Sequence, residues 1–414
     1  MSRTFYPDKK PIEALGVVLG ARFLSDRLVT LIRITSLALL CGIILSINLW
    51  FPISRSIPRA PLLAALPEKV TPPVEYLLSG VLSACLVALV FAKRPVKYLT
   101  VIVVSLVLLC LLDQTRLQPW VYQYLAVFVV LFLDQQQSRG EGTSLLTLAA
   151  LQAIVASLYF WGGVQKLNYS FGHEVLPQLL KPVQNFFVVS QPQLSALGFG
   201  LALIEIFTGC GLLLRKTRKI CIYLTIAMHA LILGLLVAQK QNNVVWVWNG
   251  ALVLMVVVLF WRNDNSIGLL FSHWHARRAG MRVSLIVVAL YAVLPILSFW
   301  GWWDLYLSGA LYSGNTPVAV VSVDNGIYEK LAPATRDKVF VTRSGKRMLP
   351  LYEWSIAELN VPPYPELRTY LQLTRELCRF AENKSQAELI VKTRPAILDG
   401  SYRVVRMNCS ELDR

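Results

Sequence analysis

The sequence has few charged residues and few histidines. Charged side chains make up 15% of the 414 residues, whereas soluble globular chains carry about a quarter. The chain therefore has too little polar surface to face water on every side, which excludes an ordinary soluble protein. The four histidines form no H-E-x-x-H motif and the seven cysteines form no C-x-x-C pair, so we predict no metal site.

Apolar residues take up the share that charged residues leave. They make up 55% of the chain and are grouped in runs long enough to cross a bilayer. We predict an all-α polytopic membrane bundle of about nine transmembrane helices, with a small α+β extracytoplasmic C-terminal domain. The predicted spans are residues 28–51, 74–92, 98–112, 118–134, 144–164, 194–214, 219–238, 244–261 and 282–300.

The chain divides into three predicted segments. Residues 1–27 are expected to form an N-terminal interfacial segment, because Pro11–Leu24 have the pattern of an amphipathic helix and no cleavable signal peptide is visible. Residues 28–300 are expected to form the transmembrane bundle. Residues 301–414 are expected to form the soluble domain.

The basic residues predict the orientation in the membrane. With the N-terminus inside, the inside segments carry seventeen Lys and Arg, and the outside segments carry seven. We therefore predict a cytoplasmic N-terminus and a periplasmic or extracellular C-terminus. Basic loops beside anionic lipid also account for the net charge of +16. Since no nucleic-acid-binding motif is present, we predict the lipid membrane, and no nucleic acid, as a partner.

The sequence also predicts secondary structure in two further regions. The connection at 166–193 is rich in apolar and aromatic residues, which predicts a short helix or cap folded back over the bundle. In the C-terminal region we predict strands at Val318–Val323, Lys338–Thr342, Glu388–Lys392 and Tyr402–Asn408, and a helix at Pro365–Phe380. Cys378 and Cys409 are the two cysteines of this polar region, and they form either a disulfide or two free thiols.

The segment Tyr159–Asn168, with the sequence Tyr-Phe-Trp-Gly-Gly-Val-Gln-Lys-Leu-Asn, is the most informative for chemistry. Its Lys166 has two interpretations. The lysine can extend along the helix end and hold its ammonium at the lipid headgroups. Alternatively, its amine is partly desolvated and serves as a general base. Gly162 and Gly163 favour the second interpretation, because they let another helix or a flat ligand approach the backbone closely.

Three ionisable residues near or inside the spans also have open interpretations. Glu205 either pairs with a cation or relays a proton, or it makes a structural hydrogen bond to a neighbouring helix. His229 is either a satisfied core residue or a functional group. Asp304 follows the last span beside Trp302 and Trp303, which suit the membrane interface. It is expected on the same side as Lys166, where it would help to close a pocket.

The segment Tyr159–Asn168 resembles a motif of the vitamin K-dependent gamma-glutamyl carboxylases. From about residue 20 to 300, the chain resembles the related bacterial HTTM (horizontally transferred transmembrane) domain proteins. Leu112–Thr115 followed by Tyr122, and the helix of His229, match further parts of that pattern. Gly163–Leu167 and Glu205 also resemble the small DoxX and MauE redox-associated membrane proteins.

The resemblance implies a bacterial inner-membrane bundle that binds a vitamin K-like quinone or quinol. It implies Lys166 as the general base, with His229 and Glu205 as further catalytic candidates. The candidates for cofactor binding are Tyr159, Trp161, Gly162, Gly163, Asp113, Tyr122 and Asp304.

Two functions are therefore open. The first is a membrane enzyme that uses a quinol or another lipid-soluble reductant, as a carboxylase, an epoxidase or a quinone-linked redox enzyme. The chain departs from the carboxylases at Pro119–Trp120, where they carry an Asn-His pair. This departure favours the alternative, a non-enzymatic membrane scaffold whose residues 301–414 recruit an extracytoplasmic protein or peptide.

Overall fold

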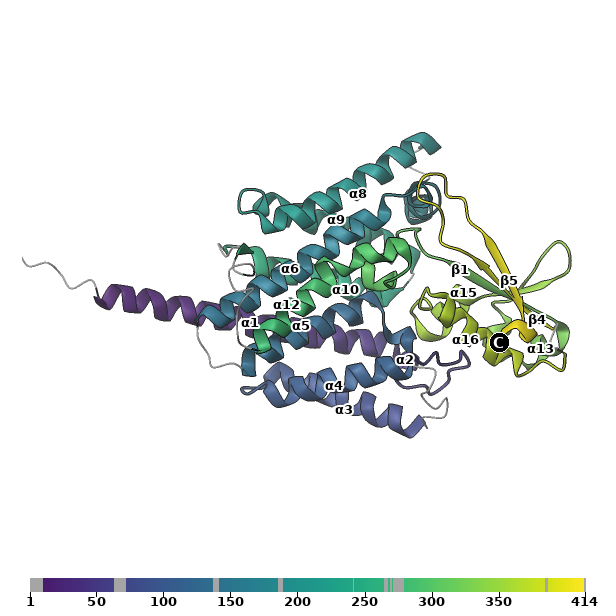
Figure 1. Ribbon diagram of the computed structural model, residues 1–414, viewed down its shortest axis with the longest axis horizontal. Coiled ribbons are helices and arrows are strands. Elements are labelled where there is room, and N and C mark those ends of the chain that lie inside the picture. Colours follow the sequence, from purple (N-terminus) through teal and green to yellow (C-terminus); the bar gives the residue numbers. More distant parts are fainter. Residues whose placement is uncertain are drawn as a thin grey trace, which may run out of the picture.

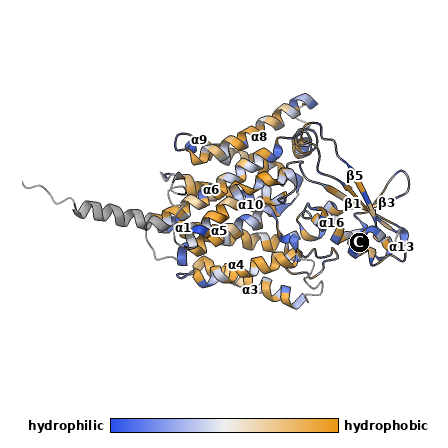
Figure 2. Ribbon diagram, in the orientation of Figure 1, coloured by the Kyte–Doolittle hydropathy of each residue, from blue (hydrophilic) through white to orange (hydrophobic). Residues whose placement is uncertain are grey.

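The computed structural model of the chain describes residues 10–62, 72–136, 141–184, 189–240, 242–263, 267–268, 270, 279–383 and 386–412. Helices lie side by side in a bundle, and a small domain with a β-sheet lies at one end of it (Figure 1). Hydrophobic residues dominate the helices, whereas the C-terminal domain is a mixture of hydrophobic and hydrophilic residues (Figure 2). This is the architecture of a multi-pass membrane protein.

Seven helical segments among the described residues are long and apolar enough to cross a membrane. They belong to α1 (Lys10–Leu45), α3 (Pro72–Phe91), α6 (Glu141–Lys166), α8 (Gln191–Leu213), α9 (Arg218–Gln239), α10 (Asn243–Phe260) and α12 (Ala279–Ala292) with the 3-10 helix Leu294–Trp300. The third and fourth predicted spans correspond to α4 (Val96–Leu112) and α5 (Pro119–Gln136), which pack against each other and against the bundle. Every predicted span therefore overlaps a helix, and seven helical segments have the length and composition of a membrane span.

The first helix differs from its predicted bounds. The predicted interfacial helix and the first span form one helix, α1, which ends at Leu45 and not near residue 51. Ser46 Oγ donates to the carbonyl oxygen of Gly42 at 2.6 Å, and the short helix α2 (Ile47–Trp50) follows. The backbone of Ser46, with φ −118° and ψ 45°, leaves the helical range, so α1 ends before it. Residues 1–9 of the predicted interfacial segment lie outside the described part of the chain.

Helix α6 lies at the centre of the bundle. It packs against α1, α5, α8, α10 and α12, and small or branched residues such as Ala149, Ile154 and Val155 are fully buried along it. After α6, the chain forms a π-helical turn (Phe171–Val175), α7 (Leu176–Leu180) and a 3-10 turn (Lys181–Val183). These short helices pack on α8 and α9, as predicted for the segment that folds back over the bundle.

The C-terminal domain is built on a five-stranded antiparallel sheet with the order β2-β3-β1-β4-β5. Its strands are β1 (Val318–Val323), β2 (Phe340–Val341), β3 (Arg347–Pro350), β4 (Ala387–Lys392) and β5 (Val404–Asn408). Its helices are α13 (Asn325–Lys330), α14 (Pro333–Arg336), α15 (Leu351–Leu359), α16 (Leu367–Cys378) and α17 (Cys409–Leu412). The four predicted strands and the predicted helix are present, although β2 is only two residues long. Strand β3 and the helices α13, α14, α15 and α17 were not predicted.

A disulfide joins Cys378 and Cys409, with an S–S distance of 2.10 Å. It connects the end of α16 to the start of α17. Of the two alternatives that the sequence leaves open, the structure therefore has the disulfide.

The C-terminal domain sits on the end of the bundle that carries Lys166. Asn168 Nδ2 donates to the carbonyl oxygen of Ser313 at 2.9 Å, and the Tyr169 amide donates to Ile397 at 2.8 Å. On the other side of the same end, Asn360 Nδ2 donates to the carbonyl oxygen of Leu45 at 2.8 Å. The end of α6 and the C-terminal domain are thus neighbours, as predicted.

Candidate functional site

Helices α6 and α8 approach each other backbone to backbone. A Cβ atom added to Gly163 would lie 2.6 Å from the carbonyl oxygen of Ala202, and one added to Gly209 would lie 2.5 Å from the backbone nitrogen of Phe160. Both distances are too short for a side chain, so glycine is required at each position. Small residues at helix contacts in membranes allow this kind of packing. The contact brings the last turn of α6 against the middle of α8.

Lys166 and Glu205 form an ion pair across this helix contact. Lys166 Nζ lies 2.6 Å from Glu205 Oε2, and it also donates to the carbonyl oxygen of Gly162 at 3.3 Å. The two side chains are 15% and 12% exposed, so the pair is mostly buried without being sealed off. A charge at membrane depth is costly unless it is paired. Of the alternatives for Glu205, the structure has the pairing with a cation.

The backbone of Gly162 forms one wall beside this ion pair. A Cβ atom added to Gly162 would lie 3.6 Å from Glu205 Oε2 and 3.8 Å from Lys166 Nζ. Gly309, which has a φ of +78°, packs against the same residue, because a Cβ atom there would lie 3.1 Å from the Gly162 nitrogen. The turn that follows the last span therefore packs against the segment of α6 that carries the ion pair.

A second cluster links α6, α9 and α10. The Tyr159 hydroxyl lies 2.8 Å from His229 Nε2, and His229 Nδ1 lies 2.6 Å from Asn249 Oδ1. Asn249 Nδ2 donates to the carbonyl oxygen of Val245, so its Oδ1 is oriented to accept from His229 Nδ1. In a neutral imidazole the other nitrogen is then the acceptor, and Tyr159 donates to it. Tyr159 and His229 are 5% and 4% exposed.

The two clusters are close enough to influence each other. His229 lies within electrostatic range of both Glu205 and Lys166. The structure therefore brings together six of the residues predicted from the sequence: Tyr159, Gly162, Gly163, Lys166, Glu205 and His229. Asn249, which fixes the orientation of His229, was not predicted, because an asparagine in an apolar span gives no signal of its partner.

Asp113 belongs to a different cluster, at the end of α4. Its Oδ2 lies 2.6 Å from Arg55 Nη1, and its Oδ1 accepts the amides of Ala60 and Thr115 at 3.2 and 3.0 Å. The neighbouring Arg116 donates to the carbonyl oxygens of Leu49 and Leu109 and lies 3.5 Å from Glu75. These contacts make Asp113 an anchor for the 55–60 segment, and both of its carboxylate oxygens already accept hydrogen bonds from the chain.

Tyr122 and Trp161 lie on the side of the bundle formed by α5 and α12. The Tyr122 ring stacks on Tyr291, with ring centroids 4.5 Å apart, and Trp161 Nε1 donates to the carbonyl oxygen of Ala292 at 3.2 Å. Trp161 follows Tyr159 by two positions, which on a helix points the two side chains in nearly opposite directions. The hydroxyls of Tyr122 and Tyr291 are buried and have no hydrogen-bond partner among the described residues.

Asp304 is paired with the C-terminal domain. Arg368 donates to it through both terminal nitrogens, with Nη1 at 2.9 Å from Oδ1, and the Tyr364 hydroxyl donates at 2.7 Å. Arg368 Nε also donates to Gln114 Oε1 at 2.9 Å. Asp304 thus helps to join the bundle to α16, and its carboxylate faces Arg368 and Tyr364, not Lys166.

No group of three or more His, Cys, Asp or Glu among the described residues is arranged to hold a metal ion. Comparison with known proteins adds no assignment, since no protein-family model, curated protein or solved structure matches the chain. The chemistry of the site must therefore be argued from its own geometry.

Proposed function

We propose that this chain is an integral membrane enzyme that acts on a quinol or another lipid-soluble reductant, with the Lys166–Glu205 pair as its proton acceptor. The observation that carries the proposal is the 2.6 Å contact between Lys166 Nζ and Glu205 Oε2, in a part of the bundle where both side chains keep some exposure. Paired ionisable groups at membrane depth mark proton relays in pumps and transporters. The resemblance to carboxylases and HTTM proteins implies the same lysine as the base.

The ion pair can take up one proton from a quinol hydroxyl. In one arrangement the pair consists of an ammonium and a carboxylate, and in the other a neutral amine faces a carboxylic acid. A proton added to the carboxylate of the first, or to the amine of the second, gives the same product, an ammonium beside a carboxylic acid. Lys166 therefore acts as a base together with Glu205, and the two residues share one role.

Two further features of the bundle bear on this proposal. His229 is oriented by Asn249 and lies within electrostatic range of Glu205, so its charge state would tune the ion pair. On the α5–α12 side of the bundle, the buried hydroxyls of Tyr122 and Tyr291 have no hydrogen-bond partner among the described residues, which would favour a polar ligand there, because buried polar groups normally have partners.

We further propose that the protein lies in a bacterial inner membrane with its N-terminus in the cytoplasm and its C-terminal domain in the periplasm. The distribution of Lys and Arg supports this orientation. The Cys378–Cys409 disulfide supports it as well, since disulfides persist on the oxidising side of a membrane.

The test uses the full-length protein in detergent with a short-chain naphthoquinol. Oxidation of the quinol by dissolved oxygen is followed by absorbance, and binding of the naphthoquinone by quenching of tryptophan fluorescence. The variants are Lys166→Met, Glu205→Gln and both together, with Lys181→Met as the matched control, because Lys181 is an exposed lysine near the same end of α6. We expect the Lys166 and double variants to lose about 10²- to 10⁴-fold of the oxidation rate, the range for loss of a general base.

The double variant separates chemistry from folding. Lys166→Met alone leaves Glu205 as an unpaired buried charge, which destabilises the bundle, whereas the double variant removes both charges. We expect the double variant to recover thermal stability without recovering oxidation. Quinol oxidation and quinone binding at the wild-type level in the double variant would disprove the proposal.

A second candidate function is a non-enzymatic scaffold that recruits an extracytoplasmic protein or peptide. It is favoured by β5, which is an edge strand paired with β4 and has Val404 and Val405 exposed. Edge strands are ready templates for pairing with another chain. If this is the function, a partner should co-purify stoichiometrically with the full-length protein and be lost in Val405→Pro, while Lys330→Ala on α13 retains it. Failure of any partner to co-purify would count against the scaffold.

A further inference from the structure

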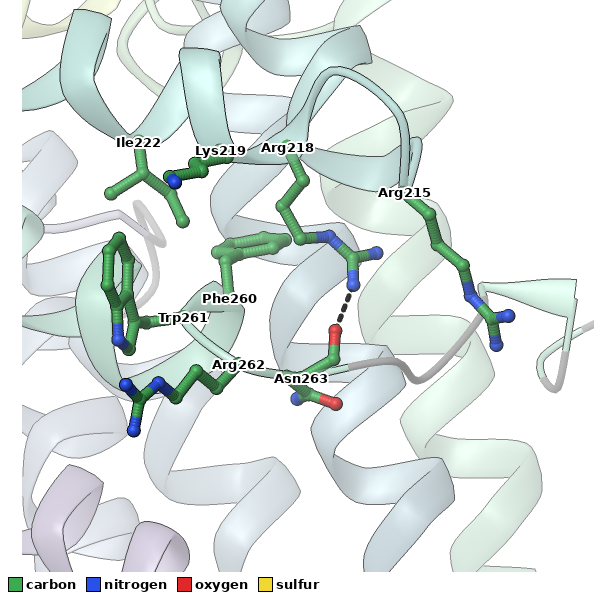
Figure 3. A pocket seen from close by; sticks show the side chains of 8 residues that line it. All are labelled: Arg215, Arg218, Lys219, Ile222, Phe260, Trp261, Arg262 and Asn263. Carbon is green, nitrogen blue, oxygen red and sulfur yellow. Dashed lines mark hydrogen bonds between the residues drawn. The ribbon is translucent and has the colours of Figure 1, made fainter.

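The end of the bundle opposite the C-terminal domain contains a basic pocket. It has a volume of about 340 Å³ and lies where α9 begins and α10 ends (Figure 3). Its described lining consists of Arg215, Arg218, Lys219, Ile222, Phe260, Trp261, Arg262 and Asn263. Four of these eight residues are cations and none is acidic. We refer to this site as the basic pocket.

The buried arginine of this pocket has a structural task. Arg218 is 5% exposed, and its guanidinium donates to the carbonyl oxygens of Leu212, Leu213 and Asn263. Figure 3 shows its side chain extending past the Phe260 ring to Asn263. Arg218 therefore fixes the turn before α9 against the end of α10, and it holds a positive charge in the wall of the pocket.

A second arginine, Arg27, binds backbone carbonyl groups at the end of α10. Arg27 of α1 donates to the carbonyl oxygens of Val258, Trp261 and Arg262 at 2.9, 2.7 and 3.1 Å. These carbonyls would otherwise place partial negative charge at the C-terminal end of α10. Arg27 therefore satisfies three carbonyl oxygens at the C-terminal end of α10, beside the pocket.

Three of the lining cations are accessible. Arg215, Lys219 and Arg262 are exposed, so their charged groups can reach a ligand at the mouth of the pocket. In Figure 3, Lys219 and Trp261 lie on one side of Arg218 and Arg215 lies on the other. A described lining with several cations and no acid, around a defined volume, is complementary to an anion with more than one oxygen, such as a phosphate.

The surroundings favour an anion that carries apolar chains. On α9, Ile220 and Tyr223 are 58% and 53% exposed, and the Tyr223 ring packs edge-on against Trp261 with centroids 6.1 Å apart. A tryptophan and a tyrosine at a helix end are typical of the membrane interface. The apolar surface of α9 begins beside the basic pocket, so acyl chains could lie along it while a headgroup occupies the pocket.

We propose that the basic pocket binds the phosphate headgroup of an anionic phospholipid and thereby fastens the α9–α10 end of the bundle to the membrane surface. Basic pockets between transmembrane helices are known to take such headgroups. The lipid contacts Arg215, Lys219 and Arg262 through its phosphate and α9 through its chains.

The experiment uses the delipidated full-length protein in a neutral detergent. Binding is measured as the rise in thermal unfolding temperature and, by native mass spectrometry, as the number of retained lipids. Three additions are compared at equal concentration: phosphatidylglycerol, phosphatidylcholine and inorganic phosphate. We expect stabilisation and one retained lipid with phosphatidylglycerol, with a weaker effect at high salt because surface charges are screened.

Two double variants with the same change in charge provide the comparison. Arg215→Gln with Lys219→Gln removes two pocket cations, and Arg94→Gln with Lys216→Gln removes two exposed cations that do not line the pocket. At about 1 kcal/mol for each basic residue near anionic lipid, the pocket variant should bind phosphatidylglycerol about 30-fold more weakly. The control should bind it as the wild type does.

Three results would overturn the proposal. Equal weakening in both double variants would mean that only the overall charge matters. Equal stabilisation by phosphatidylcholine would mean that the anion is not recognised, and equal stabilisation by inorganic phosphate would mean that the pocket takes a soluble anion instead of a lipid. The comparison of the three additions on the wild-type protein decides between these sources even if a variant folds poorly.

Discussion

At the scale of single residues, two carboxylates of the C-terminal domain have opposite responses to pH. Burial raises the pKa of Glu366 to about 6, although its carboxylate accepts the amide of Leu305 at 2.9 Å. Burial would also raise the pKa of Glu358, but hydrogen bonds from Ser56, Ile57 and Trp354 outweigh it and lower that pKa. Glu366 is thus stabilised in its protonated form and Glu358 in its charged form.

The sign of each effect on stability follows from these shifts. The folded domain holds the Glu366 proton up to a pH of about 6, while the unfolded chain releases it near the ordinary pKa of 4.5. The stability that Glu366 contributes is therefore present below pH 4.5 and is lost as the pH rises to about 6. We expect Glu366→Gln to unfold at a higher temperature than the wild type at pH 7.5 and at nearly the same temperature at pH 4.5.

Glu358→Gln is the control with the opposite sign. The stability that Glu358 contributes is present above pH 4.5 and is lost as the pH falls through its lowered pKa. Glu358→Gln should therefore unfold at a lower temperature than the wild type at pH 7.5. Thermal unfolding followed by tryptophan fluorescence at both pH values measures both effects. A Glu366→Gln protein that is less stable than the wild type at pH 7.5 would contradict the assignment.

At the scale of the helices, the contact between α6 and α8 depends on Gly163. We expect Gly163→Ala to lose about 1–3 kcal/mol of stability, because the added methyl group meets the Ala202 carbonyl oxygen and forces the helices apart. Gly234 on α9 is the matched control, since a Cβ atom there has open space around it. Gly234→Ala should be neutral or gain up to about 1 kcal/mol from better helix propensity. Equal thermal stability of the two variants would show that the α6–α8 contact does not require glycine at position 163.

The helices themselves were largely predictable, and the contacts between them were not. Long apolar runs mark helices whatever packs against them, so the nine predicted spans coincide with helices. Strand β3 was missed because it has four residues, begins with Arg347 and ends in Pro350, and forms only by pairing with its neighbours β1 and β2. The partnership of Lys166 with Glu205 depends on the rotation and height of α8 against α6, and no local pattern contains that information.

At the scale of the whole molecule, α4 and α5 decide how many times the chain crosses the membrane. Helix α4 has 17 residues, which at 1.5 Å each is about 26 Å and close to the thickness of the apolar layer. The turn that joins α4 to α5 reaches the C-terminal domain, because Gln114 Nε2 donates to Gln372 and Gln118 Nε2 donates to Pro362. The turn between the two helices thus lies at the end that carries the domain. From this we predict that both helices cross the membrane, which would make nine crossings.

The C-terminal domain lies on the same side of the membrane with seven or with nine crossings, because α4 and α5 add either two crossings or none. Alkaline phosphatase fused after Arg414 should therefore be active in the periplasm, and the same enzyme inserted after Lys216 should be inactive. A cysteine introduced by Leu117→Cys, in a background without the free cysteines, distinguishes seven crossings from nine. With nine spans, a membrane-impermeant maleimide should label it in intact cells once the outer membrane has been made permeable, and Lys97→Cys should stay unlabelled. Labelling of Lys97→Cys, together with alkaline phosphatase activity of the insertion after Lys216, would show that the orientation is the reverse of the predicted one.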